Sequence, residues 1–445
     1  MFIRERLERV RQPAIFGLAA AVSRAGGILA VPIAAQALSL EELGYYAICV
    51  AFIQLLCQML SLGGSVAVAK AGADDINNAR SLAVRFSLVA AALAGLFFVA
   101  GVTSQHRFGL LAGLIALISA LEAHQQLYQL VIRAQERESL FLATSTLKAF
   151  AWPIGLLAYV FAVQKGRADL PIELVLWFQL AVYAAVSFVF LIASGTREGG
   201  QPGVAGHFRA AVILSVPMVF HSLAQWVMSS ADRIILGQMT DGETLAFYSL
   251  AYSLASIMFV IISGMALYLP HAIMKNVSRW GDPLFRLRFQ RWYAVVYVVS
   301  FTVLMLAYAF DYSVTNFLRY QNPEMFLILG IVGAGFVFTG AYHFYVPFLF
   351  AAGRTGLVTT QTLKACAMYA LAIVPLVHFL SAMGAAIGTM LVWVYYMMAI
   401  RVHAVAFLSE QGIGDNQFRS EFAVVFVASA TCLLVSIVLW ATVVS

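Results

Sequence analysis

Long apolar stretches, separated by short segments that carry most of the charged residues, extend along the whole chain. The hydrocarbon core of a bilayer is about 30 Å thick, and an α-helix needs roughly 20 apolar residues to cross it. The pattern therefore predicts an all-α, polytopic membrane protein and leaves no room for a soluble domain of any size. Thirteen stretches meet the requirement, at residues 13–38, 45–68, 82–103, 108–132, 140–163, 174–194, 211–237, 245–270, 292–311, 325–350, 357–379, 382–403 and 421–444.

The segment between the first two predicted helices recurs later in the chain. It is SLEELGYYA at residues 39–47 and DGETLAFYS at residues 241–249, a constant offset of 202. A second pair of segments has the sequence TLKA, at residues 146–149 and 362–365. These repeats indicate that the chain arose by duplication. Duplication is frequent in membrane transporters, because two related lobes can expose a shared path to either side of the membrane.

The polar, glycine-rich segment at residues 194–207 separates two sets of six predicted helices, and one helix is left over. An even number of helices in each half makes the two repeats parallel. We predict an amino-terminal six-helix lobe (1–200), a carboxyl-terminal six-helix lobe (201–403) and a cytoplasmic link with an extra helix (404–445). Thirteen helices would place the carboxyl terminus outside the cytoplasm, whereas twelve or fourteen would place it inside.

The composition excludes several classes of function. With 62% hydrophobic residues, 11% charged residues and a mean hydropathy of +0.87, the chain lies far from soluble domains. The four cysteines lie in predicted spans without metal-ligand spacing, so we expect neither a disulfide framework nor a metal site. The chain also lacks paired catalytic carboxylates and the GxSxG, P-loop and HExxH motifs, so we expect neither enzyme activity nor a cofactor.

The basic residues predict the orientation of the chain. With a cytoplasmic amino terminus, 21 of the 27 lysines and arginines fall on inner segments and four on outer segments. This bias accounts for the net charge of +6, so we expect no nucleic-acid partner. The longest inner connection, residues 271–291, carries five basic residues, and we expect it to contact anionic lipid at the inner surface.

Four ionisable residues lie well inside predicted spans, namely Arg24, Glu122, Asp232 and Arg233. Charge at this depth costs several kcal/mol or more unless it is paired or hydrated. Arg24 has small neighbours and no acidic residue within two turns of its helix, which favours contact with an anion or water. Asp232 and Arg233 are adjacent and do not face each other. Either an ion pair between the lobes or contact with a substrate would compensate the buried charges of these two residues.

Polar stripes extend along three predicted helices. At about 100° per residue, the polar residues of the helix at 108–132 fall within one wedge, and His124 points away from it, as expected for a hydrogen bond to another helix. Such stripes suggest a hydrated central cavity, with helix-to-helix hydrogen bonding as the alternative for each residue. The stripes consist of Gln54, Gln58, Ser61 and Ser65, of Glu122, Gln125, Gln126 and Gln129, and of His221, Gln225, Ser229 and Asp232, with Arg233 at the edge.

Lys148 and Lys364 lie at the cytoplasmic starts of paired helices. They could flank the inward mouth of a cavity, or they could be ordinary positive-inside anchors. We therefore predict a translocation cavity with these lysines at its mouth. Its lining would consist of Arg24, Gln54, Gln58, Glu122, Gln126, Gln129, His221, Gln225, Asp232 and Arg233.

Two segments carry a family resemblance. The first is LSLEELGYYAI (38–48), after a helix with an internal arginine, and the second is SADRIILGQMTDGETLAFYSLAYSL (230–254). Over residues 10–403 the chain resembles the bacterial Wzx-type polysaccharide flippases, in the superfamily that includes multidrug and toxin extruders and the lipid II flippase. The motifs separate this superfamily from most other carriers but discriminate poorly within it.

The resemblance implies a MATE-like fold in the bacterial inner (plasma) membrane, with a cytoplasmic amino terminus. It implies that the protein moves undecaprenyl-pyrophosphate-linked oligosaccharide from the cytoplasmic to the outer leaflet by alternating access. Arg24 would then bind the pyrophosphate, and Asp232 and Arg233 would form the lobe-interface pair. The implied partners are the lipid-linked oligosaccharide, membrane lipid, a polysaccharide polymerase and other assembly proteins.

Three other functions are kept as alternatives. A cation-coupled multidrug or small-molecule exporter of the same fold would place carboxylates in its cavity, and Glu122 and Asp232 keep this open, whereas Arg24 opposes cationic substrates. A major-facilitator carrier would need a GxxxDRxGR-type loop, and the segment at 70–81 has no such motif. A scaffold that does not transport would tolerate Arg24→Ala.

Overall fold

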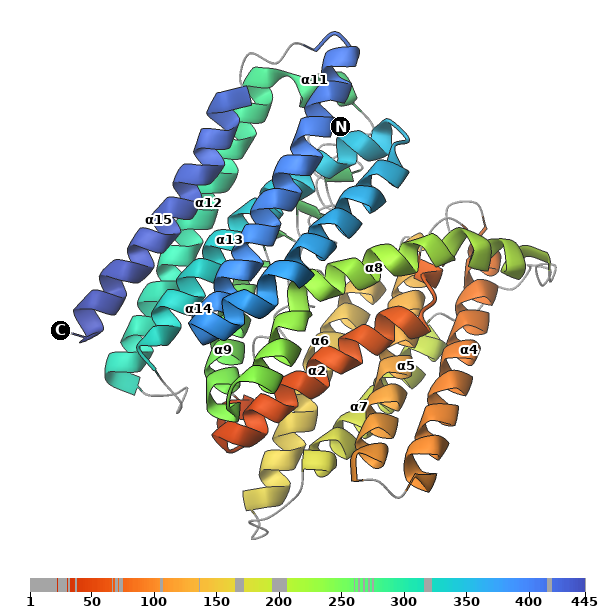
Figure 1. The fold of residues 1–445 in the computed structure, drawn as a ribbon. Coiled ribbons are helices and arrows are strands. Elements are labelled where there is room, and N and C mark those ends of the chain that lie inside the picture. The colour runs from red at the N-terminus through yellow and green to blue at the C-terminus, as the bar shows by residue number, and fades with distance from the viewer. Residues whose placement is uncertain are drawn as a thin grey trace. The chain divides into compact units, whose positions relative to one another are not determined.

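The structure is a computed structural model of the chain. It describes residues 22, 30, 33–36, 38–65, 67–68, 71, 75–104, 107–135, 137–164, 172–193, 206–259, 261–262, 265–266, 269–270, 273, 276–315, 322–413 and 418–444. The named elements (Figure 1) are α2 (Leu40–Leu60), α4 (Ile76–Thr103), α5 (Arg107–Ala134), α6 (Glu138–Gln164), α7 (Ile172–Ala193), α8 (Gly206–Met239), α9 (Gly242–Ala255), η1 (Ser256–Met258), α11 (Val277–Gly281), α12 (Pro283–Phe310), η2 (Asp311–Thr315), α13 (Glu324–Ala351), α14 (Thr355–Glu410) and α15 (Phe418–Val444).

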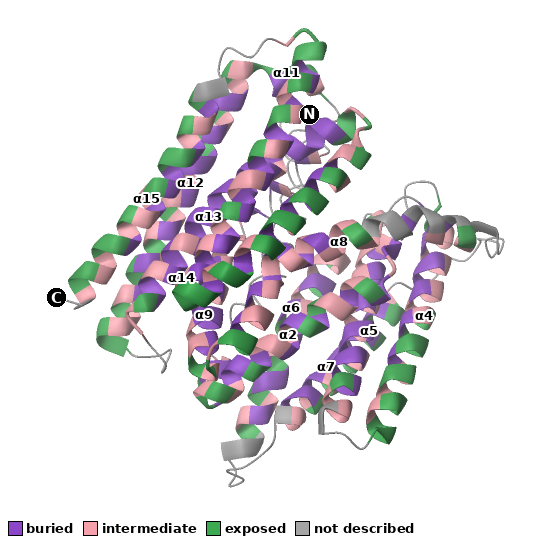
Figure 2. Cartoon of the chain, viewed as in Figure 1, coloured by how far each residue is buried: buried purple, intermediate pink, exposed green. Residues whose placement is uncertain are grey.

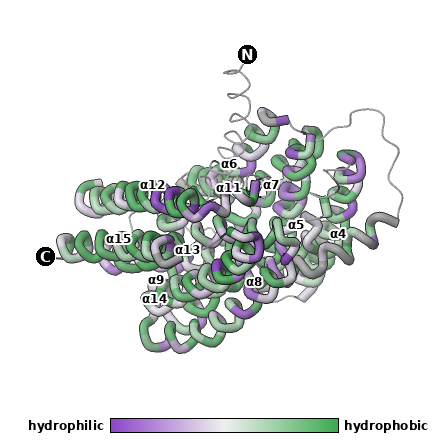
Figure 3. The backbone as a smooth tube through the Cα atoms, turned by 90° about the horizontal axis from the view of Figure 1, so that it is seen from above, coloured by the Kyte–Doolittle hydropathy of each residue, from purple (hydrophilic) through white to green (hydrophobic). Residues whose placement is uncertain are grey.

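The predicted all-α class is confirmed, because the described residues form helices and no strand. Nine of the helices in the described part of the chain are long and apolar enough to cross a membrane. Hydrophobic positions predominate along α15 in particular (Figure 3). The first predicted span, residues 13–38, lies mostly outside the described residues.

Contacts along the chain divide it into two compact units, Met1–Trp226 and Val227–Ser445. The predicted lobes (1–200 and 201–403) and the predicted link with an extra helix (404–445) stay a prediction. The division by contacts falls within α8, whose part up to Trp226 belongs to the first unit. There the Trp226 indole N–H donates to the Ala51 carbonyl oxygen at 3.0 Å.

The recurring segments begin equivalent helices. Ser39 caps α2 through a reciprocal capping box with Glu42, and Asp241, at the offset of 202, caps α9 by accepting a hydrogen bond from the Thr244 backbone N–H. This bond lowers the pKa of the Asp241 carboxyl below its ordinary value, because it favours the charged form. The duplication thus preserves the helix start although the capping residue differs.

Two further pairs of helices agree in length between the units. Helices α4 and α12 each have 28 residues and follow aspartate N-caps, Asp75 and Asp282. Helices α5 and α13 also have 28 residues each. Helix α5 packs against α2, α4, α6 and α7, and α13 against α9, α14 and α15, so these helices form the centres of their units. Helix α13 is accordingly buried along most of its length (Figure 2).

Helix α14 is a hairpin of two helical arms, in agreement with the predicted spans 357–379 and 382–403. Its backbone turns at Ser381, which has φ 51° and ψ −131°. The arms lie side by side and antiparallel, since the Thr362 and Tyr396 hydroxyls are 2.6 Å apart and Gln361 Nε2 lies 3.0 Å from His403 Nε2. The reversal thus lies between the two predicted spans.

We expect Gly384→Ala to destabilise this hairpin. An added Cβ would lie 1.9 Å from the carbonyl oxygen of Leu376 in the opposite arm, so the backbones would have to separate. Such overpacking costs roughly 1–3 kcal/mol. The melting temperature of the detergent-solubilised protein measures the effect. Gly356→Ala is the control because a Cβ there meets open space, and an equal loss in both variants would contradict the close approach.

The thirteenth predicted helix, α15, lies between α12 and α13. In the first unit the corresponding helices, α4 and α5, pack directly on each other through Gly101 and Gly109. In the second unit α12 and α13 contact each other only slightly, and both pack against α15. The Ser429 hydroxyl of α15 donates to the Ala334 carbonyl oxygen of α13 at 3.2 Å. The extra helix is therefore an integral part of the second unit.

Candidate functional site

Polar side chains of α2, α5 and α6 gather in the first unit. The Lys148 ammonium of α6 lies 3.9 Å from a Glu122 carboxylate oxygen of α5. Nearer the end of α5, the Gln129 amide donates to the Ser145 hydroxyl of α6 at 3.2 Å. Helix α2 is joined to α5 by the Ser119 hydroxyl, which lies 3.1 Å from the carbonyl oxygen of Ile53. We call Gln54, Gln58, Glu122, Gln126, Gln129 and Lys148 the first-unit polar face.

This face remains accessible. Gln54 is exposed and the other five residues are half-buried, and the side chains of Glu122 and Lys148 are each 16% exposed. Accessible amides and charges are costly in contact with hydrocarbon. The face is therefore suited to a hydrated path, where its amides could bind hydroxyl groups and Lys148 could bind an anion.

Two residues adjacent to the face are used inside the unit. Gln125 is fully buried, and its amide donates to the Tyr183 carbonyl oxygen and the Ser187 hydroxyl, both at 3.1 Å. The His124 ring lies 3.1 Å from the Ser87 hydroxyl and 3.3 Å from the Ser187 carbonyl oxygen. The prediction that His124 bonds between helices is confirmed. Gln125 matches the alternative interpretation of the stripe, in which a polar residue joins helices.

The stripe predicted on the helix at 211–237 extends across the division between the two units. His221 and Gln225 lie in the half of α8 that belongs to the first unit, and both are half-buried. Asp232 and Arg233 belong to the second unit, where Asp232 is fully buried and Arg233 is half-buried. The four residues therefore do not form a single accessible face within one unit.

Asp232 is surrounded by donors from its own unit. One carboxylate oxygen accepts the Arg233 backbone N–H at 2.8 Å, and the other accepts the Tyr248 hydroxyl of α9 and, at 3.4 Å, the Thr389 hydroxyl of α14. The Arg233 guanidinium lies 4.2 Å from the centre of the Tyr252 ring, in cation–π geometry. These bonds stabilise the buried carboxylate and join α8, α9 and α14.

The lysines of the two TLKA segments have different surroundings. Lys148 is half-buried beside Glu122, whereas Lys364 is exposed on α14. Lys364 shares its helix face with Met368 and Leu371, which are 49% and 79% exposed. An exposed apolar face favours the membrane-anchor interpretation for Lys364. Arg24 lies outside the described residues, and its role remains a prediction.

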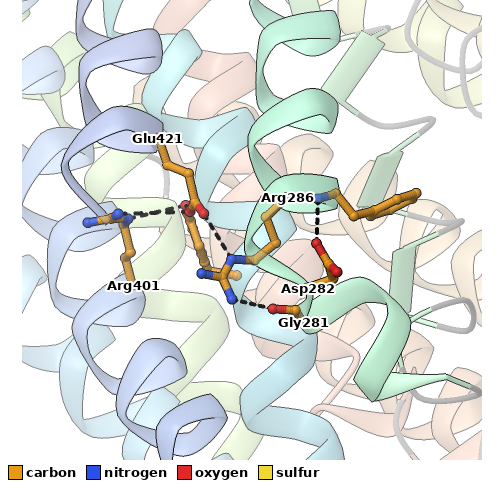
Figure 4. A network of polar contacts seen from close by, with 7 residues as sticks. Gly281, Asp282, Arg286, Arg401 and Glu421 are labelled. Atoms are coloured by element: carbon orange, nitrogen blue, oxygen red, sulfur yellow. Dashed lines mark hydrogen bonds and ion pairs between the residues drawn. The ribbon is translucent and has the colours of Figure 1, made fainter. Parts of the chain in front are cut away.

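A buried ionic network joins four helices of the second unit (Figure 4). The Glu421 carboxylate of α15 accepts the Arg286 Nε–H of α12 at 3.0 Å and the Tyr345 hydroxyl of α13 at 2.6 Å. Arg401 of α14 lies 3.8 Å from the same carboxylate and donates to the Tyr345 hydroxyl oxygen at 3.1 Å. We call Arg286, Tyr345, Arg401 and Glu421 the Glu421 network. Its charged side chains are at most 3% exposed.

The network buries one of the five basic residues of 271–291, the connection that we expected to contact anionic lipid. Residues from Pro283 onward belong to α12, and Arg286 is fully buried with Glu421 and the Gly281 carbonyl oxygen. Sequence reasoning did not single out Glu421, because it lies at the edge of the predicted span 421–444. An acidic residue at the start of an otherwise uncharged span is the signal that could have identified it.

Comparison with known proteins assigns the chain to a family. Residues 12–270 match the family described as "Polysaccharide biosynthesis protein", which is more than half of the 445 residues. The chain belongs to this family. A curated relative, the probable multidrug resistance protein NorM of Agrobacterium fabrum (strain C58 / ATCC 33970), is 28% identical over 204 residues. The aligned part is 43% of this chain and 42% of that protein, so the match spans less than half of the relative.

Solved structures of transporters share the fold of this polysaccharide biosynthesis family member. An inward-facing multidrug resistance MATE family transporter of the MOP superfamily has a TM-score of 0.61 and 13% identity, covering 86% of this chain and 95% of that one. The lipid II flippase MurJ in an inward closed conformation has a TM-score of 0.58 and 13% identity, covering 97% and 100%. Identities this low support the fold alone.

The family match makes the chain a member of the polysaccharide biosynthesis protein family, and its apolar helices and the similar structures identify a multi-pass membrane protein with a MATE-like fold. The resemblance drawn from the sequence is confirmed at this level, and so is the MATE-like fold. The two similar structures are described as a multidrug resistance transporter and a lipid II flippase.

Proposed function

We propose that this protein moves an undecaprenyl-pyrophosphate-linked oligosaccharide from the cytoplasmic to the outer leaflet of a bacterial inner membrane, by alternating access of its two lobes. The observation that carries this proposal is the first-unit polar face. Four of its six residues are glutamines, which can bind sugar hydroxyls as donors and as acceptors. Lys148 adds a cation that a phosphate can approach. Membership of a polysaccharide biosynthesis family supports the same substrate class.

The charged headgroup explains why a protein is needed. A pyrophosphate crosses hydrocarbon only with its charge compensated, and an arginine can pair with its oxygens bidentately. Arg24 is the candidate for this role on the strength of the family resemblance, with Lys148 as a second cation. The polyprenyl tail can stay in lipid during transfer. A polysaccharide polymerase and other assembly proteins would be the partners at the outer surface.

The second candidate is a cation-coupled multidrug exporter, because a curated relative carries that name. Such an exporter needs an accessible carboxylate for cations. Here the Glu122 carboxylate lies 3.9 Å from the Lys148 ammonium, and Asp232 is enclosed by Tyr248 and Thr389. Asp232 is thus enclosed, whereas Glu122 is accessible but lies beside a lysine, which repels a cationic substrate. This arrangement favours the oligosaccharide over a cationic drug.

Deletion of the gene tests the proposal. We expect surface polysaccharide to be lost and the lipid-linked oligosaccharide to accumulate on the cytoplasmic side, where added glycosidase cannot reach it in intact spheroplasts. Resistance to cationic drugs should not change. Intact surface polysaccharide together with increased drug sensitivity would support the exporter instead.

A further inference from the structure

The structure separates the basic residues of 271–291 into two groups. Arg286 is buried in the Glu421 network, whereas Arg279, Arg288 and Arg291 are exposed. Lys275 lies outside the described residues. Arg279 lies in α11, whereas Arg288 and Arg291 lie near the start of α12, at the end that the charge bias places at the cytoplasmic surface. They are therefore available to a ligand, and Arg286 is not.

One face of α12 combines exposed arginines with an exposed tryptophan. Arg291 and Trp292 lie three and four residues after Arg288, and Val295 lies four and three residues after them, so the four side chains share a face. Trp292 and Val295 are 58% and 63% exposed. Two turns of helix therefore present two cations, an amphipathic ring and then an aliphatic side chain, in that order along the helix axis.

This order matches the polarity profile of half a bilayer. Beyond Val295 the same side of α12 continues with Val299, Val303 and Leu306, which are 57%, 61% and 53% exposed. Arginines at the headgroup level, tryptophan at the interface and aliphatic residues below them are the arrangement that a membrane-embedded helix presents to lipid. A phospholipid lying along this face would meet matching chemistry from its phosphate to its acyl chains.

The equivalent helix of the first unit shows that insertion into a bilayer does not require the two arginines. Helices α4 and α12 start after Asp75 and Asp282, an offset of 207, and have equal length. At this offset Arg288 corresponds to Ser81 and Arg291 to Val84. Trp292 corresponds to Arg85, which is half-buried with its guanidinium 6.0 Å from the centre of the Phe208 ring. The equivalent positions of α4 therefore carry one half-buried cation in place of the two exposed arginines of α12.

The acidic groups near these arginines have partners within the protein. Asp282 accepts the Phe285 backbone N–H at 2.9 Å as the N-cap of α12, and Glu421 is enclosed by Arg286, Arg401 and Tyr345. No ion pair between Arg288 or Arg291 and a carboxylate occurs among the residues that the structure describes. The face thus has a local excess of positive charge.

We propose that the Arg288, Arg291 and Trp292 face of α12 binds an anionic glycerophospholipid. The guanidinium groups bind its phosphate, since a planar fork pairs with two phosphate oxygens. The Trp292 ring lies at the level of the glycerol, and Val295 and Val299 contact an acyl chain. This site is separate from the first-unit polar face and holds a resident lipid instead of the transported molecule.

Native mass spectrometry of the full-length protein, exchanged from detergent into mixed micelles with phosphatidylglycerol or phosphatidylcholine, tests the site. We expect phosphatidylglycerol to remain bound in preference to phosphatidylcholine. The double variant Arg288→Gln/Arg291→Gln should weaken phosphatidylglycerol binding by roughly thirtyfold, because each basic residue near a membrane surface contributes a factor of about five.

A charge-matched control separates a site from general attraction. Arg354→Gln/Lys364→Gln also removes two cations of the second unit, the half-buried Arg354 and the exposed Lys364, and phosphatidylglycerol binding should remain close to that of the unaltered protein. Equal losses in the two double variants, or no loss in either, would overturn the proposal. Binding of undecaprenyl pyrophosphate but not phosphatidylglycerol at this face would also overturn it and assign the face to the transported lipid. All of these outcomes can be measured whether or not the protein transports oligosaccharide.

Discussion

Replacing Glu421 with glutamine should destabilise the second unit by about 3–5 kcal/mol, the largest effect on stability that we expect from one side chain. The neutral amide would leave the buried guanidinium groups of Arg286 and Arg401 without the charge that both of them approach. One of the two carboxylate oxygens would become an NH2 donor, so either Arg286 or the Tyr345 hydroxyl would lose its acceptor. The melting temperature of the detergent-solubilised protein should fall by roughly 10 °C.

A matched control is Glu410→Gln. Glu410 pairs with Arg354 at 2.5 Å, but these side chains are 53% and 40% exposed, so the pair should contribute less than about 1 kcal/mol. A small shift in both variants would mean that the Glu421 network does not hold α15 in the second unit. A large shift in Glu421→Gln alone would establish the thirteenth helix as a structural requirement.

Replacing Lys148 with alanine should reduce export of surface polysaccharide at least tenfold, at unchanged protein level in the membrane. Lys148 is the described cation of the first-unit polar face, and the protein needs cations to stabilise a pyrophosphate in a medium of low polarity. Complementation of a deletion strain, with quantification of surface polysaccharide, measures this loss. Lys364→Ala, its counterpart in the second TLKA segment, should retain nearly full export because Lys364 lies on an exposed apolar face.

The partner of Lys148 allows a second comparison. If the lysine only balances the charge of Glu122, then the double variant Glu122→Gln/Lys148→Met should recover export by removing both charges together. If Lys148 contacts the substrate, the double variant should remain as defective as Lys148→Ala. We expect the second result, and recovery would limit this pair to a structural role.

The helices could be predicted closely because their causes are local. The spans at 82–103, 108–132 and 140–163 all correspond to observed helices, α4, α5 and α6. The length of each apolar stretch and the polar segments at its ends determine such helices without reference to the rest of the chain. The recurring segments were also informative, since each supplies the N-cap of a helix in the structure.

The polar residues could be predicted only in part. Helical periodicity placed Gln125 and Gln126 in one wedge, but the structure buries Gln125 against Tyr183 and leaves Gln126 half-buried. A difference of one residue position decides which of two adjacent amides meets a neighbouring helix. The neighbour is defined by the fold and is absent from the local sequence.

The Glu421 network could not be predicted for a related reason. Its Arg286 and Glu421 are 135 residues apart, and their contact depends on the position of α15 between α12 and α13. Nothing in the repeat indicates this position, because the first unit has no described counterpart of α15. Sequence reasoning therefore assigned Arg286 to a surface connection.

The central claim is that this chain alone moves a lipid-linked oligosaccharide across a membrane. The most direct test is reconstitution of the purified protein into liposomes that contain an undecaprenyl-pyrophosphate oligosaccharide with a fluorescent sugar, followed by addition of a membrane-impermeant quencher. Without protein, about half of the label should be protected in the inner leaflet, and the account predicts that this pool becomes accessible over time with the unaltered protein and much more slowly with Lys148→Ala. An inner pool that stays protected in the presence of folded protein would contradict the account.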